Sequence, residues 1–283
     1  MSNLLQNKID FVAIINVENA NPNGNPVNGN RPRRDYRGYG EISAECIRRK
    51  IRNRMQDLGA NIFVQSEDRA TDGFNSLSQR ASDMMGGIKD REVYANSACD
   101  AWLDVRAFGQ VFAFSDNKGV SVGVRGPVSV HLARSVCPVE VEDMQITKSV
   151  NGENKGKDEA RASDTMGMKH FVRHGVYVVK GSINVQAAEK TGLTEEDAET
   201  IKECLRTLFV NDASSARPEG SMQVVKLFWF KHNCKEGQYS PAKVQHSVHV
   251  ELKDPTKEPV SLNDYVITRD ELPGLQCEEI EGI

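Results

Sequence analysis

The sequence predicts an α+β fold of the split β-α-β kind, with a ferredoxin-like or RRM-like sheet. Three observations predict it: an apolar, β-branched run near the start, two segments with helical apolar spacing, and several apolar runs separated by glycine turns. Without the long intervening stretches, the predicted order is strand, helix, two strands, strand, helix, strand. At 283 residues the chain is long enough to bury a sizeable core.

The first predicted strand is Ile9–Val17, a short apolar run rich in β-branched residues. A long loop, Glu18–Gly40, is predicted next, because Asn, Pro and Gly at the density of N-P-N-G-N-P-V-N-G-N propagate neither a helix nor a strand. The loop ends in R-P-R-R-D-Y-R-G-Y-G. Arginine interleaved with tyrosine on a glycine-rich chain suits phosphate pairing and base stacking.

The strongest helix pattern covers Ser43–Leu58, with Ser43 as a good N-cap and Gly59 as a good stop. The predicted buried stripe comprises Ala44, Ile47, Ile51, Met55 and Leu58. Arg48 and Arg52 fall on one shoulder of this stripe, Lys50 and Arg54 fall on the other, and Arg49 lies well off it. Because five basic residues in seven positions repel one another, we expect an anionic group nearby; a plain solvent-exposed basic face is the alternative.

The middle of the chain is predicted to hold an insertion followed by strands. Asn61–Tyr94 has no clean period and is predicted to be partly helical. Trp102–Phe114 and Gly119–Pro138 look like strands around glycine turns. The turn Gly123–Pro127 would let the backbone approach a ligand closely, with Arg125 at its tip; a simple tight turn is the alternative.

A second long irregular stretch is predicted at Val139–His174, and its polar part, Asn151–Asp164, is expected to be mobile. An extended hairpin with an apolar, cationic tip would wedge between bases and clamp phosphates, unless Met166 and Phe171 simply pack into the core. His170 and His174 are four residues apart and would share a metal on a helix, but no third ligand is in view, so we expect no metal site.

The last predicted elements alternate strand and helix. They are a strand at Gly175–Val185, a helix at Thr194–Phe209, a loop at Ser214–Gly220 and a final strand at Met222–Lys231. Thr194 is the expected N-cap of that helix, and Asp197 makes its start resemble a capping box. The remaining residues are predicted to be irregular.

Cysteine usage and hydropathy indicate a protein of the reducing cytoplasm. The six cysteines are Cys46, Cys99, Cys137, Cys204, Cys234 and Cys277, and no two of them form a C-x-x-C pair. We expect free thiols rather than a disulfide framework or a zinc site. The sequence contains no apolar run near the ~18 residues that a membrane span needs, and no secretory signal is expected at the start.

The formal net charge of −4, taken whole, argues against nonspecific nucleic-acid binding. The distribution argues otherwise: residues 31–54 hold nine basic and three acidic side chains, whereas residues 251–283 hold nine acidic and three basic ones. The asymmetry indicates one anion-binding surface and one acidic surface, although two ordinary solvated faces would give the same counts.

Eight motifs occur in one order along residues 9–232. They are N-P-N-G-N-P, R-P-R, S-x-x-C-I-R-R-K-I-R, D-V-R-x-F-G, V-R-G-P-V, M-G-x-K-H, G-x-Y-V-x-K-G and S-S-A-R-P. In this order they resemble the repeated backbone subunit of type I CRISPR Cascade complexes, the seventh Cas family, and most closely its type I-C form. A single motif would be weak, but eight in order are specific.

The resemblance implies a modified RRM-like palm over residues 1–283, with an inserted fingers region and a protruding thumb. The implied insertions fall at about 18–40 for a basic loop, 60–100 for the fingers and 139–174 for the thumb. Residues 233–283 are expected to form an irregular acidic C-terminal region.

The implied function is that of a non-catalytic filament subunit in antiviral defence. Copies polymerise head to tail along a CRISPR RNA, bind its backbone without reading sequence, and leave most bases open to pair with target DNA. The thumb of one copy folds over the RNA held by its neighbour. The implied partners are CRISPR RNA, target DNA through the guide, further copies, a cap subunit at the RNA 5′ end, and the large and small subunits; no cofactor is implied.

The resemblance places RNA-binding positions on two loops, one helix, one glycine-rich turn and the thumb. They are Arg31, Arg33, Arg34, Ser43, Arg48, Arg49, Arg52, Gly123, Arg125, Gly126, Met166, Lys169, His170 and Arg217. A subunit that does not read sequence is expected to contact phosphates and sugars rather than base edges.

Two other functions stay open. The first is an RNase on the same scaffold, in which Asp35 of the basic loop and a divalent ion position a water for phosphodiester cleavage. The simpler interpretation is that Asp35 neutralises its arginine neighbours. The second is a general single-stranded nucleic-acid-binding protein without a CRISPR partner, which the basic loop and helix fit equally well.

Overall fold

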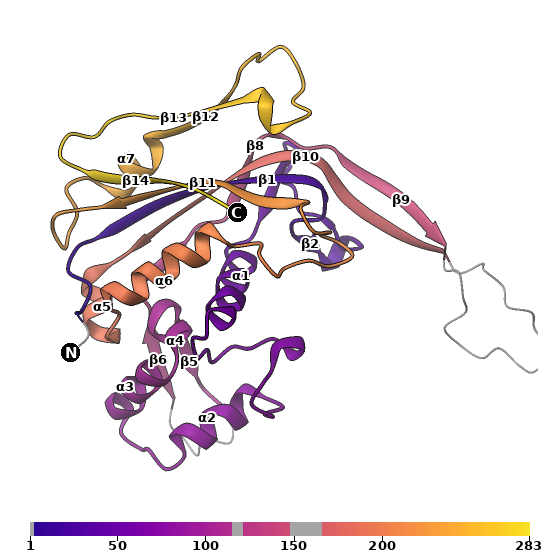
Figure 1. The fold of residues 1–283 in the computed structure, drawn as a ribbon. Helices are drawn as coiled ribbons and strands as arrows, with labels where there is room; N and C mark the ends of the chain where they lie inside the picture. The colour runs from indigo at the N-terminus through magenta and orange to yellow at the C-terminus, as the bar shows by residue number, and fades with distance from the viewer. Residues whose placement is uncertain (1–2, 115–120, 148–165) are drawn as a thin grey trace, which may run out of the picture.

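The computed structural model describes residues 3–114, 121–147 and 166–283. The segment expected to be mobile, Asn151–Asp164, lies outside the described residues, as does Gly119 at the start of a predicted strand region. A central antiparallel sheet with the two longest helices packed on one face organises the described chain (Figure 1). The predicted combination of helices and a sheet is confirmed.

The central sheet has the strand order β14-β11-β1-β10-β8-β4. Its strands are β1 (Ile9–Ala20), β4 (Tyr39–Ile42), β8 (Ala133–Pro138), β10 (Met166–Ile183), β11 (Met222–Lys231) and β14 (Gln276–Glu281), with short β7 (Val128–Val130) paired to β10. Helix α1 (Ala44–Asp57) follows β1, and helix α6 (Glu195–Arg206) follows β10. Within the sheet, β11 lies beside β1, β1 beside β10, and β10 beside β8. When these four strands are numbered in chain order, their arrangement across the sheet is 4-1-3-2.

Helix α1 forms as predicted, because Ser43 caps it and an apolar stripe fixes it to the sheet. The Ser43 Oγ accepts a hydrogen bond from the Cys46 N–H at 3.2 Å. Ile47 and Met55 are buried in the main core, but Leu58 is 45 % exposed, so the predicted stripe is wrong at its last position. Leu58 is the C-cap and lies beyond the last helical residue, Asp57.

Helix α6 shows the full capping box that its sequence only suggested. The Thr194 Oγ1 accepts from the Asp197 N–H, and the Asp197 carboxylate accepts from the Thr194 N–H at 2.9 Å. The helix ends at Arg206 rather than Phe209, because the chain turns at Thr207, whose carbonyl accepts from the Val210 N–H. Before it, the predicted strand Gly175–Val185 ends at Ile183, and the unpredicted helix α5 (Val185–Thr191) begins.

The insertion between α1 and β7 has its own apolar core, separate from the core under the sheet. It comprises α2 (Leu77–Met85), α3 (Arg91–Ala101), α4 (Leu103–Phe108), β5 (Gly109–Phe112) and β6 (Val122–Arg125). The centre of its core is aromatic, with the Phe63 ring 4.7 Å from that of Trp102 and 5.1 Å from that of Phe112.

The prediction that Trp102–Phe114 starts as a strand is wrong, because its first part is helix α4. Leu103 and Ala107 pack in the main core, whereas Trp102 and Val105 pack in the insertion core. Only helical spacing sends residues 103 and 107 one way and 105 the other; a strand would put all three on one face. The two cores together therefore override the β-propensity of this segment.

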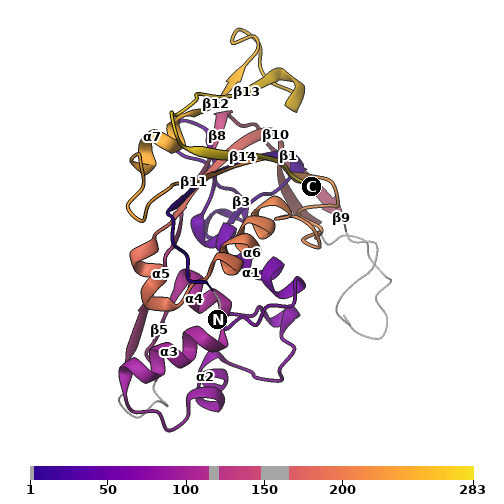
Figure 2. The ribbon, with the colours of Figure 1, turned by 60° about the vertical axis from the view of Figure 1, so that its left-hand side comes forward.

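Both stretches predicted to be irregular contain paired backbone. Within Glu18–Gly40, β1 continues to Ala20, and β2 (Gly24–Asn25) pairs with β3 (Arg31–Pro32). Within Val139–His174, β9 (Val141–Thr147) pairs with the first part of β10, from Met166 opposite Thr147 to Val172 opposite Val141. The chain leaves the sheet here as a two-stranded ribbon (Figures 1 and 2). Main-chain hydrogen bonds between β9 and β10, rather than an alternation of apolar side chains, order this ribbon.

The C-terminal region is not irregular, and this expectation is corrected. It contains α7 (Pro241–His246), the paired strands β12 (Val248–Leu252) and β13 (Tyr265–Arg269), and β14, an edge strand of the central sheet. Figure 2 shows α7, β12 and β13 on the sheet face opposite α1 and α6. That face carries buried Phe228 and Phe230, which need an apolar cover. No helix in the described ranges is both long and apolar enough to span a membrane.

Candidate nucleic-acid interface

Basic residues from three distant segments meet around the start of α1. The Cys46 thiol lies within electrostatic reach of Arg33, Lys50 and Arg217, and burial raises its pKa against their opposing effect. The Arg33 N–H donates to the Asn23 carbonyl at 3.0 Å, while the Asn23 side chain accepts from the Ser43 N–H at 2.9 Å. The Asn-rich loop thus fastens Arg33 beside the N-cap of α1, where the helix dipole favours anions.

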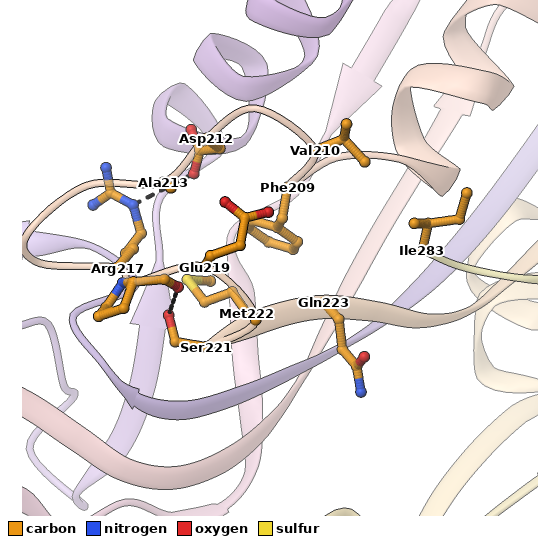
Figure 3. Close-up of a pocket in the computed structure, with 12 residues that line it drawn as sticks. Phe209, Val210, Asp212, Ala213, Arg217, Glu219, Ser221, Met222, Gln223 and Ile283 are labelled. Atoms are coloured by element: carbon orange, nitrogen blue, oxygen red, sulfur yellow. Dashed lines mark hydrogen bonds and ion pairs between the residues drawn. The ribbon is translucent and has the colours of Figure 1, made fainter.

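The S-S-A-R-P loop supplies Arg217 and also lines a small cavity (Figure 3). The Arg217 Nε lies 3.4 Å from the Asp212 carboxylate, and its Nη1 donates to the Asn21 carbonyl at 3.4 Å. The loop is held to the end of β1, because the Asn21 N–H donates to the Ala216 carbonyl at 2.9 Å. Arg217 and Arg33 are therefore both fastened to residues 21–23 at the end of β1.

A groove between α1 and the β5–β6 hairpin is lined by three of the four arginines of the helix. Its volume is about 640 Å³, and its lining includes Arg48, Arg49, Arg52, Phe108, Gly109, Gln110, Val111 and Val124. Val111 is exposed on the hairpin side, opposite Gly123 in the strand pairing. Glu45 also lines the helix side of the groove, so this wall carries three arginines and one carboxylate, and the hairpin wall combines apolar residues with Gln110.

The anionic groups expected near the basic helix are carboxylates of this chain. Arg48 pairs with Glu45 at 2.7 Å, Arg52 pairs with buried Asp104 at 2.8 Å, and Lys50 pairs with Asp212. Arg49 donates to the Val64 carbonyl at 2.6 Å. The partner of Arg52 is thus fully buried, whereas the partner of Arg48, Glu45, is exposed.

At one of its glycines, the glycine-rich turn packs closely against the protein's own backbone. A Cβ on Gly126 would lie 2.3 Å from the Phe108 carbonyl carbon, so this glycine is required by packing against α4. Gly123, by contrast, has nothing within 4 Å of such an atom. Arg125 is exposed and pairs with Gly109 across the hairpin.

The ribbon carries Met166, Lys169 and His170 on β10. Met166 is 66 % exposed, so the alternative that it packs in the core is wrong, whereas Phe171 is buried. His170 Nδ1 and Arg31 Nη1 both lie 2.6 Å from the Asp143 carboxylate, which ties the basic loop to the ribbon. These bonds, that of His170 first, lower the pKa of Asp143. His170 and His174 are on a strand, not on one turn of a helix.

Asp35 and Arg34 belong to the fold of the basic loop. Asp35 Oδ1 accepts from the N–H groups of Arg37 at 2.8 Å and Tyr39 at 3.0 Å, and Oδ2 pairs with Arg134. Although desolvation acts to raise its pKa, these bonds outweigh it and the pKa of Asp35 is lowered. Arg34 donates to the Val139 carbonyl at 3.3 Å. Among the described residues, no three acidic, histidine or cysteine side chains converge to hold a metal.

Sequence reasoning missed the carboxylates that organise the site. Asp104 lies in D-V-R-x-F-G, and Asp212 lies just before S-S-A-R-P, so both were close to recognised motifs. An acidic residue inside an otherwise apolar run, as at Asp104, signals a buried ion pair. No sequence signal identifies Arg52 as its partner, 52 residues away.

The fold and this surface define a mixed α/β protein with a cation-lined face beside an antiparallel sheet. The sequence profile of the family described as CRISPR-associated protein Cas7 matches residues 7–270. The chain belongs to the Cas7 family.

Several known proteins are similar to this chain. A CRISPR-associated protein Cas7 of Haloferax volcanii is 26 % identical over 287 aligned positions, covering 94 % of this chain and 82 % of the relative. A chain of a CRISPR RNA-guided surveillance complex, pre-nicking, has a TM-score of 0.51 at 13 % identity, covering 84 % of this chain and 81 % of that one. A chain of a second CRISPR RNA-guided surveillance complex has a TM-score of 0.43 at 17 % identity, covering 79 % and 68 %.

Proposed function

We propose that this chain is a non-catalytic backbone subunit that polymerises along CRISPR RNA in a type I-C Cascade. It binds the guide backbone without reading sequence and presents the bases for pairing with target DNA in antiviral defence. The observation that carries the proposal is the surface along α1, where Arg33 and Arg217 meet at one end and Arg48 lines a groove farther along. Membership of the Cas7 family supports it.

In this proposal the central sheet with α1 and α6 is the RRM-like palm, helices α2 and α3 with the β5–β6 hairpin are the fingers, and the β9–β10 ribbon is the thumb. The sheet face that RRM proteins use for RNA is covered here by α7, β12 and β13. RNA therefore binds on the loops and the helix shoulder, as the positions of Arg33, Arg48 and Arg217 support. Contacts of this kind hold phosphates and carry no sequence information.

The exposed ribbon suits a wedge that interrupts the RNA at intervals. Met166 and Met168 project from one face of the ribbon, and Met144 and Ile146 from the other, all of them largely exposed. Large apolar side chains on a narrow ribbon separate stacked bases at a cost offset by new contacts. Lys169 lies among them and supplies a cation for the adjacent phosphate.

The partners of the proposed subunit are CRISPR RNA, target DNA through the guide, further copies in a head-to-tail filament, a cap subunit at the RNA 5′ end, and the large and small subunits, in the cytoplasm. A net charge of −4 suits such a filament, because a strongly basic subunit would repel its own copies. Head-to-tail contacts between identical copies generate open helices.

Replacing Arg48 and replacing Arg52 are expected to have different effects, although the two residues lie one turn apart on α1. Arg48→Ala should weaken binding of single-stranded RNA and lower the salt slope by roughly 0.7 while leaving stability within about 0.5 kcal/mol, because its partner Glu45 is exposed. Arg52→Ala should instead destabilise the fold, because it leaves buried Asp104 without its cation. Fluorescence anisotropy across a salt series and urea unfolding measure the two effects; equal salt slopes for Arg48→Ala and the parent would remove Arg48 from the proposed interface.

The RNase alternative makes a separate prediction. Both carboxylate oxygens of Asp35 are already engaged by loop N–H groups and by Arg134, which favours a structural role. The assembled complex, incubated with complementary RNA and Mg²⁺, is expected to leave that RNA intact. RNA fragments that disappear in an Asp35→Asn variant would contradict the non-catalytic proposal.

A further inference from the structure

We propose that Lys50 and Asp212 are positioning residues for Arg217, holding its guanidinium ready for an RNA phosphate while contacting no RNA themselves. The inference rests on the proposed role of Arg217 in RNA binding. The three residues form what we call the relay: two linked ion pairs, Lys50 with Asp212 and Asp212 with Arg217, which connect α1 to the S-S-A-R-P loop. Figure 3 shows the outer half of this relay, with Arg217 and Asp212 facing one another.

The geometry makes Asp212 a carboxylate shared by two cations. Lys50 Nζ donates to Asp212 Oδ2, and Arg217 Nε lies 3.4 Å from the same oxygen. The exposed fraction of the side chain rises along the relay, from 4 % for Lys50 to 13 % for Asp212 and 28 % for Arg217. Only the last member of the relay is open enough to meet a phosphate.

Burial excludes Lys50 as an RNA ligand. Its Nζ lies 5.3 Å from the centre of the Phe209 ring, under the loop rather than at the surface. Burial lowers the pKa of Lys50, and Asp212 opposes that effect by stabilising the ammonium. Lys50 can therefore act on bound RNA only through Asp212.

The sharing of Asp212 decides how much charge Arg217 presents to a phosphate. Two cations and one carboxylate leave a net positive charge, and this charge resides on the exposed arginine. Without Lys50, the carboxylate would pair with Arg217 alone and neutralise it. The backbone around Arg217 is already fixed, because Ser214 and Arg217 exchange N–H to carbonyl bonds of 2.8 and 3.0 Å. The direction of the side chain is set by Asp212 together with the Asn21 carbonyl, and the only carboxylate among these partners is that of Asp212.

A double-mutant cycle tests the relay with the full-length chain and a fluorescein-labelled oligouridylate as the probe. Arg217→Ala is expected to weaken binding roughly tenfold, as for one lost charge-assisted hydrogen bond, and to lower the salt slope by roughly 0.7. Lys50→Met should produce the same two changes. The double variant should bind no more weakly than Arg217→Ala, because Lys50 acts only through Arg217.

Control variants separate positioning from folding. Lys50→Arg keeps the cation and should restore affinity. Asp212→Asn preserves the side-chain shape and removes the carboxylate through which Lys50 acts, so Lys50→Met should have no further effect in the Asp212→Asn background. Lys235→Met removes the lysine of a more exposed pair with Glu189 and should leave affinity unchanged. Urea unfolding of every variant confirms that the folded protein is being titrated.

The outcomes distinguish failure of the relay from failure of the proposed function. Additive losses in the double variant, normal binding by Lys50→Met while Arg217→Ala is impaired, or a full effect of Lys50→Met in the Asp212→Asn background would overturn the relay and leave Arg217 as an RNA ligand. Normal binding by Arg217→Ala would overturn both the relay and the role of Arg217.

Discussion

Replacing Asp10 by alanine is expected to lower the free energy of unfolding by about 3–5 kcal/mol, because it breaks a buried ion-pair network and leaves its partners uncompensated. Asp10 is fully buried in β1. Its carboxylate accepts from Lys8 Nζ at 3.2 Å, faces His232 Nε2 at 2.9 Å and accepts from the Ser182 hydroxyl. His232 Nδ1 accepts a hydrogen bond from the Gln238 N–H, so the ring N–H is at Nε2 and donates a hydrogen bond to Asp10.

Urea unfolding of Asp10→Ala measures the effect, and a matched control exists in the chain. Asp270 also pairs with a histidine, His249, at 2.9 Å, but this pair lies at the surface. Asp270→Ala should therefore change stability by less than about 0.5 kcal/mol. Equal losses for the two variants would mean that burial does not set the value of the Asp10 network.

The same network predicts a pH dependence. Desolvation acts to raise the pKa of Asp10, but the bonds from His232, Ser182 and Lys8 outweigh it, and the net pKa lies below the ordinary aspartate value. A lowered folded-state pKa means that the stabilisation is fully present above the unfolded-state pKa of about 3.9 and is lost as pH falls through the folded value. The stability difference between the parent and Asp10→Ala should therefore shrink in acid below about pH 4; a constant difference would contradict this assignment.

Asp104→Ala is expected to have the second large effect, also about 3–5 kcal/mol. Asp104 is fully buried in α4, where Oδ1 accepts from the Phe63 N–H at 2.6 Å, and Oδ2 accepts from the Val64 N–H at 3.1 Å and from Arg52 Nε at 2.8 Å. One carboxylate thus joins α4, the entry to the insertion and α1. Its loss leaves two main-chain N–H groups and a guanidinium unpaired.

Limited proteolysis distinguishes a local from a global consequence of Asp104→Ala. Because Asp104 fastens the insertion, cleavage between α1 and α3 should appear before cleavage in α6. Asp254→Ala removes a surface aspartate paired with Lys257 and serves as the control. Simultaneous cleavage everywhere would show that the insertion does not open independently.

Local signals explain which elements the sequence predicts. Ser43 and Thr194 are N-caps followed by helical apolar spacing, and β11 is rich in β-branched and aromatic residues, so these elements were recognisable. The alternation V-H-V-E-L of β12 was also readable as a strand but lies among prolines and charges. Helix α4 was not, because two different cores decide its conformation.

The site was predictable in its charges but not in their partners. The cluster at residues 31–54 predicted a basic surface, and in the structure Lys50 is buried and Arg52 is paired with buried Asp104. Such partners lie 52 and 162 residues away in sequence, so only the tertiary fold reveals them. The acidic end likewise pairs with Lys202 and Lys226 of its own chain through Glu278 and Glu281.

Nuclease footprinting of the purified protein on a long single-stranded RNA, at moderate salt, tests the proposed filament most directly. The proposal predicts protected stretches separated by evenly spaced sensitive nucleotides, because each thumb interrupts the RNA at a fixed interval. Uniform protection would indicate a plain single-strand binder, and no protection would indicate a chain that does not assemble on RNA by itself. Either result would contradict the assignment of the β9–β10 ribbon as a thumb.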